Sequence, residues 1–242
     1  MDLTNTAAIV TGAASGLGAA TAAALTAAGA TVHGFDLADF DGIQVDVTDP
    51  EAVREAVAVA AGGPEPLRVV VNCAGIAPSA RILGRGGVHD LAMYAKVVQV
   101  NLIGTFNVMA LAAERIAATE PDAHGQRGVI VNTASVAAYE GQVGQAAYSS
   151  SKGGIVGLTL PAARDLAQHG IRVMTIAPGI MFTPMLETVS EEYRAGLAAG
   201  VPFPGRLGTP AEYAALALSI VANDYLNGEV IRLDGALRMA PR

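Results

Sequence analysis

Short apolar runs alternate with longer stretches of helical pattern from the first residues to the last. Runs that are apolar throughout are typical of parallel strands buried on both faces. We predict strands at residues 7–11, 31–35, 43–46, 68–72, 128–132, 171–176 and 229–233. We predict helices at residues 16–28, 50–60, 88–99, 102–118, 147–168, 190–199 and 210–222. This alternation predicts an α/β fold, a Rossmann-type doubly wound parallel sheet of about seven strands with helices on both faces.

One connection in this pattern is too short for the usual crossover. Only residues 37–42 separate the second strand from the third. A parallel crossover normally needs a dozen or more residues, most often a helix. We therefore expect the connecting helix to be missing, or the third strand to be a stub. The chain has neither a linker-like segment nor a repeat, so residues 1–242 are expected to form a single domain.

Composition narrows the function classes. The chain is 52% hydrophobic and 15% charged, which is enough to build a sizeable core. Its net charge of −7 argues against nucleic-acid binding. A single cysteine, Cys73, excludes an intramolecular disulfide framework and a cysteine-rich metal site, and no metal is predicted. We find no run of about 18 strongly apolar residues and no basic region at the start, and so expect a cytoplasmic protein without a membrane span.

The first strand is followed by a glycine-rich turn, residues 11–18, with the spacing G-x-x-x-G-x-G at Gly12, Gly16 and Gly18. Glycine allows a tight turn and a close approach of backbone to a pyrophosphate, while the helix that follows offers free N–H groups. The spacing is a variant of the dinucleotide-binding fingerprint. A plain strand–helix turn is the alternative.

Acidic residues follow the next two strands. Asp36 comes 20 positions after Gly16, where an acid binds the adenosine ribose hydroxyls in this architecture. An acid there repels a 2′-phosphate by about 4 kcal/mol at about 4 Å and a dielectric near 20, which favours NAD over NADP. Asp46 and Val47 follow the third strand, and small residues, Cys73, Ala74 and Gly75, follow the fourth. A solvated strand end for Asp36 and a capping turn for Asp46 are the alternatives.

Tyr148 and Lys152 are the strongest catalytic candidates. They stand four positions apart at the start of a long predicted helix and so share one face. A nearby ammonium is expected to lower the pKa of the phenol and make it a general acid/base. Ser135 follows the fifth strand, where its hydroxyl can bind a substrate oxygen, and Asn101 falls between two predicted helices. An ordinary surface pair, a turn serine and a helix-cap asparagine are the alternatives.

Lysine is scarce in this chain. Only Lys96 and Lys152 occur, against thirteen arginines. Lysine and arginine differ in proton chemistry. In a chain that otherwise uses arginine, a lysine is therefore a weak sign of a specific role.

Together these residues resemble the short-chain dehydrogenase/reductase superfamily. By this resemblance, Tyr148 moves the hydroxyl proton, Ser135 orients the substrate oxygen, Lys152 binds the nicotinamide ribose, and Asn101 holds a water. The dinucleotide-binding half would span about residues 1–120, and the catalytic and substrate half about 121–242. The candidate substrate contacts are Ser135, Gln145 and Tyr148. The candidate cofactor contacts are Gly12, Ser15, Gly16, Leu17, Gly18, Asp36, Asp46, Val47, Cys73, Ala74, Gly75, Tyr148, Lys152, Pro178, Gly179, Met181 and Thr183.

A closer resemblance is to the type-2 3-hydroxyacyl-CoA dehydrogenases, also described as 2-methyl-3-hydroxybutyryl-CoA and 17β-hydroxysteroid dehydrogenases. It is carried by residues 127–172, by 173–179 with Thr183, and by the segments VPFPGRLGTPAEYA and LNGEVIRLDGALRM. It implies an NAD-dependent enzyme that interconverts 3-hydroxyacyl-CoA and 3-oxoacyl-CoA, in fatty acid metabolism. The family usually forms dimers or tetramers, and a homotetramer is expected here. Residues 37–42, 76–91 and 180–185 depart most from this group, so the substrate is the least determined feature.

Other functions remain open from the sequence. One is an NAD-linked dehydrogenase of another secondary alcohol or ketone, such as a steroid or a small hydroxyketone. A 3-oxoacyl carrier-protein reductase would usually prefer NADPH, against which Asp36 argues. A non-catalytic NAD sensor could dispense with Tyr148 and Lys152. Arg81 and Arg85, in a glycine-rich loop, could meet CoA phosphates or be merely solvated.

Overall fold

A single parallel sheet of seven strands forms the centre of the protein, whose computed structural model describes residues 1–187 and 190–241. Its strand order is β3-β2-β1-β4-β7-β8-β9, with every pairing parallel. The strands are β1 (Ala7–Thr11), β2 (Thr31–Asp36), β3 (Ile43–Gln44), β4 (Leu67–Asn72), β7 (Gly128–Thr133), β8 (Ile171–Pro178) and β9 (Val230–Leu233). The predicted α/β fold class is confirmed.

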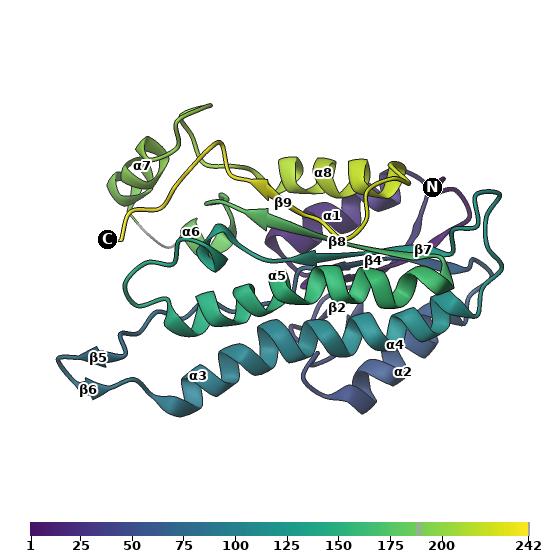
Figure 1. Cartoon of the computed structure of the whole chain (residues 1–242), viewed down its shortest axis with the longest axis horizontal. Helices are drawn as coiled ribbons and strands as arrows, with labels where there is room; N and C mark the ends of the chain where they lie inside the picture. Colours follow the sequence, from purple (N-terminus) through teal and green to yellow (C-terminus); the bar gives the residue numbers. More distant parts are fainter. Residues whose placement is uncertain (188–189, 242) are drawn as a thin grey trace.

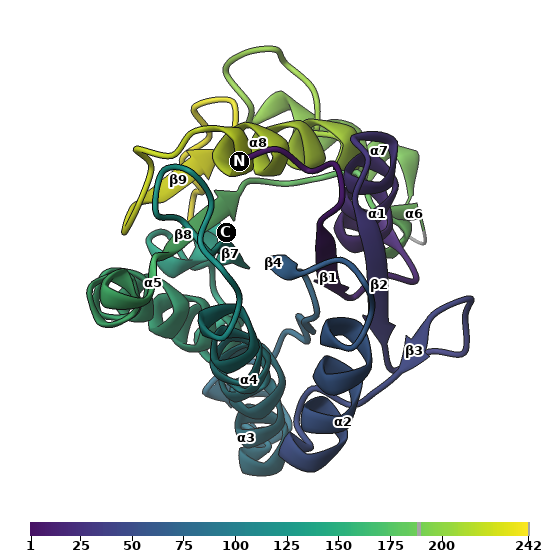
Figure 2. The same cartoon turned by 90° about the vertical axis from the view of Figure 1, so that its right-hand side faces the viewer.

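Helices cover both faces of this sheet (Figures 1 and 2). One layer is α1 (Gly16–Ala27) and α8 (Pro210–Ala222), which pack against each other. The other layer contains α2 (Pro50–Ala61), α3 (Leu91–Val98), α4 (Thr105–Ala117) and α5 (Ala146–Leu166). Two short helices, α6 (Pro184–Glu187) and α7 (Glu191–Ala199), lie toward the end of the molecule at which the strands finish (Figure 1).

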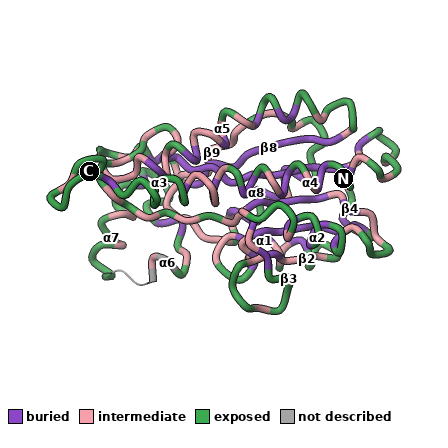
Figure 3. Tube along the Cα trace, turned by 90° about the horizontal axis from the view of Figure 1, so that it is seen from below, coloured by how far each residue is buried: buried purple, intermediate pink, exposed green. Residues whose placement is uncertain are grey.

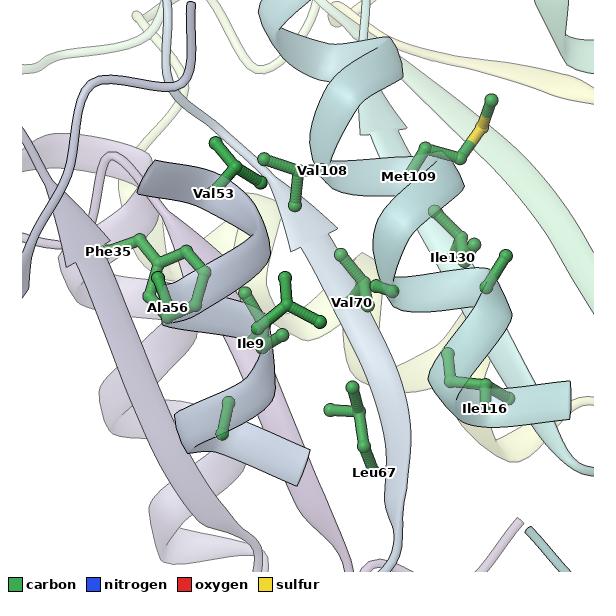
Figure 4. Close-up of a cluster of buried hydrophobic side chains, with 14 of the residues drawn as sticks. Ile9, Phe35, Val53, Ala56, Leu67, Val70, Val108, Met109, Ile116 and Ile130 are labelled. Carbon is green, nitrogen blue, oxygen red and sulfur yellow. The ribbon is translucent and has the colours of Figure 1, made fainter. Parts of the chain in front are cut away.

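Each face of the sheet carries its own hydrophobic core. Along β1, Ile9 points to the α2–α4 layer, while Ala8 and Val10 point to the α1–α8 layer. Figure 4 shows Ile9 beside Val70 of β4 and near side chains of α2 and α4. Buried positions follow the strands and the inward faces of the helices (Figure 3). At about 1.5–3 kcal/mol for each fully buried large apolar side chain, these two cores hold the strand ends in place.

The short connection after β2 is as the sequence suggested. The structure has no helix within residues 37–42, and β3 is two residues long. A two-stranded hairpin, β5 (Leu83–Gly84) with β6 (Gly87–Val88), was not predicted. It extends from the end of the molecule where the strands finish (Figure 1).

The two helices predicted at 88–99 and 102–118 are one continuous helix. A π-helical turn, Gln99–Gly104, joins α3 to α4. Leu91–Ala117 is therefore a 27-residue helix whose most apolar 18-residue window has a mean hydropathy of 1.3, enough by length and composition to cross a membrane. The expectation that no such stretch exists was wrong, because Lys96 and Arg115 lie far enough apart to leave an apolar window between them. In this structure the helix is part of the layer on one face of the sheet, where it packs on α2 and α5.

Candidate active site

A cavity of about 490 Å³ opens at the carboxyl ends of the strands. We refer to it as the strand-end cavity. The residues predicted to contact a cofactor lie on its wall, and their contact with a cofactor stays a prediction. They are Gly12, Ser15, Gly16, Leu17, Gly18, Asp36, Asp46, Val47, Cys73, Ala74, Gly75, Tyr148, Lys152, Pro178, Gly179, Met181 and Thr183. Parallel strands end at the same edge, so segments far apart in the sequence meet there.

The glycine turn is shaped for close backbone approach. Gly12 has a φ of +67°, and an added Cβ there would lie 2.9 Å from the backbone nitrogen of Ala74. An added Cβ on Gly18 would overlap the carbonyl oxygen of Gly12. Ser15, the N-cap of α1, makes no side-chain hydrogen bond to the helix, so the first-turn N–H groups stay available. This arrangement fits a dinucleotide pyrophosphate.

The acidic residues on the wall are held by local hydrogen bonds. Asp36 accepts one from the Ala14 N–H and one from the Ala38 N–H, both at 3.0 Å. Asp46 accepts bonds from the backbone N–H and hydroxyl of Thr48, which keep the pKa of its carboxyl below the usual value. Asp46 is thus a turn residue as well as part of the wall. The cap of α2 is instead Asp49, which accepts from Glu51 and Ala52.

Lys96 was not among the predicted site residues, although it lies on this wall. Its positive charge contributes to the lowered pKa of Asp46. Both lysines of the chain thus line one cavity. The scarcity of lysine was the only signal in the sequence, and it did not say where Lys96 would lie.

The predicted catalytic side chains converge at one end of the cavity. Ser135 follows β7, and Tyr148 and Lys152 come from the first two turns of α5. Lys152 is buried, and its Nζ donates a hydrogen bond to the Thr133 carbonyl at 2.7 Å. Its Nζ lies 5.8 Å from the centre of the Tyr148 ring. Burial lowers the pKa of Lys152 to about 8 from a usual value of 10.5.

The lowered pKa expected for Tyr148 beside Lys152 is not found, because desolvation of the phenol is the largest influence on its pKa. Burial raises the pKa of the Tyr148 phenol above its usual value, and the nearby Ser135 hydroxyl opposes that rise. Desolvation disfavours the phenolate, and Lys152 directs its Nζ at the Thr133 carbonyl rather than at the phenol oxygen. The prediction of a lowered pKa was wrong for this state of the site.

Asn101 lies in the π-helical turn, completely buried, and does not cap a helix. Its Oδ1 accepts from the Ile76 N–H at 2.8 Å, and its Nδ2 donates to the Ile76 carbonyl and to the Ser151 hydroxyl. The side chain thus fastens residues after β4 to helix α5. A Cβ on Gly75 would lie 3.1 Å from Asn101 Oδ1 and 3.6 Å from Lys152 Nζ, so Asn101 is close to Lys152. Its role in holding a water stays a prediction.

Gln145 is set apart from the other two predicted substrate residues. Ser135 and Tyr148 line the strand-end cavity, whereas Gln145 lines a neighbouring cavity of about 620 Å³. We refer to this second space, between residues 80–83 and 137–149, as the hairpin cavity. Gln145 Oε1 accepts a hydrogen bond from the Gln142 N–H. Arg81 also lines the hairpin cavity, and Arg85 lies in the turn between β5 and β6.

A glycine cradle at a helix start, an acid at the end of the second strand and a tyrosine beside a buried lysine at one sheet edge define a nicotinamide-dependent oxidoreductase of Rossmann type. Residues 6–194 match the family model of the short chain dehydrogenases. The chain belongs to this family.

Named relatives agree with that assignment. The 3-hydroxyacyl-CoA dehydrogenase type-2 of Bos taurus is 54% identical over 249 residues, covering 97% of this chain and 95% of that protein. The protein of the same name from Homo sapiens has the same identity and coverage. The crystal structure of 3-hydroxyacyl-CoA dehydrogenase type-2 from Mycobacterium avium superposes with a TM-score of 0.93 at 45% identity, covering 98% of each chain.

Proposed function

We propose that this protein interconverts 3-hydroxyacyl-CoA and 3-oxoacyl-CoA thioesters with NAD as its cofactor. The observation that carries the proposal is the 54% identity to relatives of that named activity over nearly the full length of both chains. The presence of Ser135, Tyr148 and Lys152 on one cavity wall supports catalysis rather than a purely sensing role.

The preference for NAD rests on Asp36. Its carboxylate stands at the wall of the strand-end cavity, where the ribose hydroxyls would donate hydrogen bonds to it. Neither residues 11–18 nor 37–42 contain an arginine or lysine that could neutralise a 2′-phosphate. A phosphate there would therefore meet uncompensated negative charge.

The nicotinamide ring supplies the hydride chemistry when bound. The side chains of this chain bind and orient the substrate and handle the proton. The Tyr148 hydroxyl gives a proton to the substrate oxygen during reduction, and in the oxidation direction the Tyr148 phenolate takes the proton from the substrate hydroxyl. The Ser135 hydroxyl donates a hydrogen bond to the same oxygen and orients it. Lys152 places positive charge 5.8 Å from the Tyr148 ring centre, which favours the phenolate during oxidation.

The deciding experiment measures NADH oxidation by the purified protein with acetoacetyl-CoA, beside NADPH and a panel of steroid and small ketones. We expect turnover with NADH and the thioester to exceed every other combination. Turnover on a ketone but not on the thioester would keep the mechanism and replace the substrate. Tyr148→Phe is expected to lower kcat by about 10²–10⁴-fold while NADH binding is retained. Full activity in that variant would overturn the mechanism.

We propose that the hairpin cavity receives part of the CoA moiety. Arg81 on its wall and Arg85 in the adjacent turn are the cationic groups that phosphates would meet. Arg81→Ala and Arg85→Ala should raise KM for acetoacetyl-CoA with little change in KM for NADH. Arg54→Ala, on α2, is the matched control because its side chain is exposed like those of Arg81 and Arg85. Unchanged KM values for the thioester would exclude this role.

We propose a homotetramer as the assembly. The outer faces of α4 and α5 frame an apolar cavity of about 850 Å³ lined by Phe106, Met109, Leu158 and Pro161 among others. An exposed apolar surface of this kind is typical of an interface. Light scattering should give a mass of about four chains. Phe106→Glu should lower that mass, and a monomeric wild-type protein would refute the assembly.

A further inference from the structure

Tyr213 of α8 reaches the floor of the active site from the opposite face of the sheet. It is completely buried, and no step of the proposed reaction uses it. Its hydroxyl lies 2.6 Å from Thr133 Oγ1 and 3.7 Å from Cys73 Sγ. These partners end β7 and follow β4, the two strands at the centre of the sheet. A buried phenol needs a hydrogen-bond partner, and any polar group would satisfy it. Here the partner is Thr133, at the active site.

The direction of the Tyr213 hydrogen bond follows from counting protons. The Thr133 hydroxyl donates to the Asn72 carbonyl at 2.5 Å. A hydroxyl has one proton to donate, so Tyr213 must be the donor toward Thr133. Burial raises the pKa of Tyr213 well above its usual value, which keeps the phenol protonated and able to donate. The result is a chain of bonds from Tyr213 through Thr133 to Asn72.

The same threonine holds the catalytic lysine. The carbonyl oxygen of Thr133 accepts the hydrogen bond from Lys152 Nζ at 2.7 Å. Thr133 is the last residue of β7, where the ladder no longer fixes the peptide on both sides. A β-branched side chain is stiff at χ1, so anchoring its hydroxyl also anchors the adjoining backbone. Tyr213 and Asn72 supply that anchor.

We propose that Tyr213 is a positioning residue for Lys152 and acts through Thr133. Its hydroxyl keeps the Thr133 carbonyl where it can receive the ammonium, so that Lys152 stays beside Tyr148. Without this bond the ammonium is held less firmly, and the phenolate of Tyr148 loses part of its stabilisation. The proposal rests on the dehydrogenase reaction but not on the thioester substrate.

The test is the pH dependence of kcat for Tyr213→Phe, which removes one hydroxyl and keeps the ring. The assay uses NAD with 3-hydroxybutyryl-CoA, or with whichever alcohol the wild-type protein oxidises in the substrate panel. We expect kcat to fall about two- to tenfold, the range that one hydrogen bond provides. The apparent pKa on the acid side of the profile should rise by about 0.3–1 unit, with KM for NAD unchanged. Tyr225→Phe, the same change on a side chain that is 99% exposed, is the control.

Variants of Thr133 separate positioning from general packing. Thr133→Ser keeps the hydroxyl and its hydrogen bonds and should retain most of the wild-type pH profile, whereas Thr133→Val should reproduce the shift seen in Tyr213→Phe. The double variant of Tyr213→Phe with Thr133→Val should be no worse than Thr133→Val alone, because both act on one path.

A lowered Tm with an unshifted pH profile would show a merely structural tyrosine and overturn the proposal. Additive losses would overturn the route through Thr133. If Tyr213→Phe does not fold, the Ser and Val variants decide the question alone.

Discussion

Asp36 Oδ2 accepts a hydrogen bond from the backbone N–H of Ala14 at 3.0 Å, which ties the end of β2 to the glycine turn. Its other oxygen accepts from the Ala38 N–H at the same distance. Two donors from two segments therefore set the position of this carboxylate before any ligand binds. The short connection 37–42 does not remove the acid from the strand-end cavity, because these bonds replace the support of a full crossover helix.

Asp36→Asn should relax the discrimination between the two nicotinamide cofactors. The amide keeps one oxygen to accept from Ala14, gives up the acceptor for Ala38, and loses the charge that repels a 2′-phosphate. A repulsion of about 4 kcal/mol at a dielectric near 20 is an upper limit at this partly exposed site. We expect kcat/KM with NADPH to rise at least about tenfold. Steady-state kinetics with both cofactors measure the ratio.

Asp39→Asn is the matched control, because Asp39 carries the same charge on the exposed connection three residues away. It should leave the cofactor ratio unchanged. Equal effects of the two substitutions would mean that general charge, rather than the position of Asp36, sets the preference.

Lys152→Met should stabilise the protein at pH 7 while removing activity. The buried ammonium is costly, since burial lowers its pKa to about 8 from 10.5. That difference corresponds to at most about 3 kcal/mol, and loss of the bond to the Thr133 carbonyl takes back part of it. We expect a net gain of about 1–2 kcal/mol, or several degrees in Tm. Lys96→Met, on an exposed side chain, should leave Tm unchanged.

The sign of the pH dependence follows from proton binding. Between pH 8 and 10.5 the unfolded chain keeps a proton on Lys152 that the folded protein has lost, so stability rises with pH in this window. Below pH 8 the destabilisation caused by the buried Lys152 ammonium is fully present. The advantage of Lys152→Met should therefore shrink as pH rises from 8 toward 10.5. Thermal unfolding at pH 7 and pH 9.5 tests this, and a lower Tm for the variant at pH 7 would contradict it.

The strands and the wall of the strand-end cavity were predictable from the sequence because they depend on local signals. Continuous apolar runs mark buried parallel strands, and parallel strands bring their ends together wherever the connections run. Gly12 and Asp36 needed only this rule to be placed on one wall. The long helix was divided in two because a π-helical turn around Asn101 leaves no pattern of its own in the sequence.

Other features depend on tertiary packing and were missed. The hairpin of β5 and β6 has strands of two residues, too short for periodicity to show. The raised pKa of Tyr148 comes from burial, which its spacing to Lys152 cannot reveal. Tyr213 occurs in a helix on the far face of the sheet, so nothing in its local sequence connects it to Thr133.

Gly18→Ala should disable the cofactor cradle. The added Cβ would overlap the Gly12 carbonyl oxygen, a backbone atom that cannot move without opening the turn. We expect NADH affinity to fall more than about tenfold, together with a lowered Tm. Fluorescence titration with NADH measures the binding.

Gly196→Ala is the control, because that helical glycine has open space where its Cβ would be. It should retain NADH affinity and gain about 0.5–1 kcal/mol in stability. Retained NADH affinity in Gly18→Ala would show that the turn can adapt.

Arg172→Met should destabilise the fold without changing the chemistry. Arg172 lies near the start of β8, at the opposite end of the sheet from the catalytic residues, and is buried. Its guanidinium donates to the carbonyl oxygens of Ile220, Val221 and Leu226 and to the side chain of Gln126. Removal leaves several buried acceptors unpaired, at a cost of about 3–5 kcal/mol.

Arg54→Met is the comparison for Arg172, since the Arg54 side chain pairs with carboxylates but is half exposed. An exposed pair contributes about 0–1 kcal/mol. Urea unfolding should therefore separate the two variants by several kcal/mol, while kcat per folded molecule stays at the wild-type value in both. Arg172 joins β8 to α8. If Arg172→Met loses kcat at urea concentrations too low to unfold it, then α8 transmits strain to Thr133 through Tyr213.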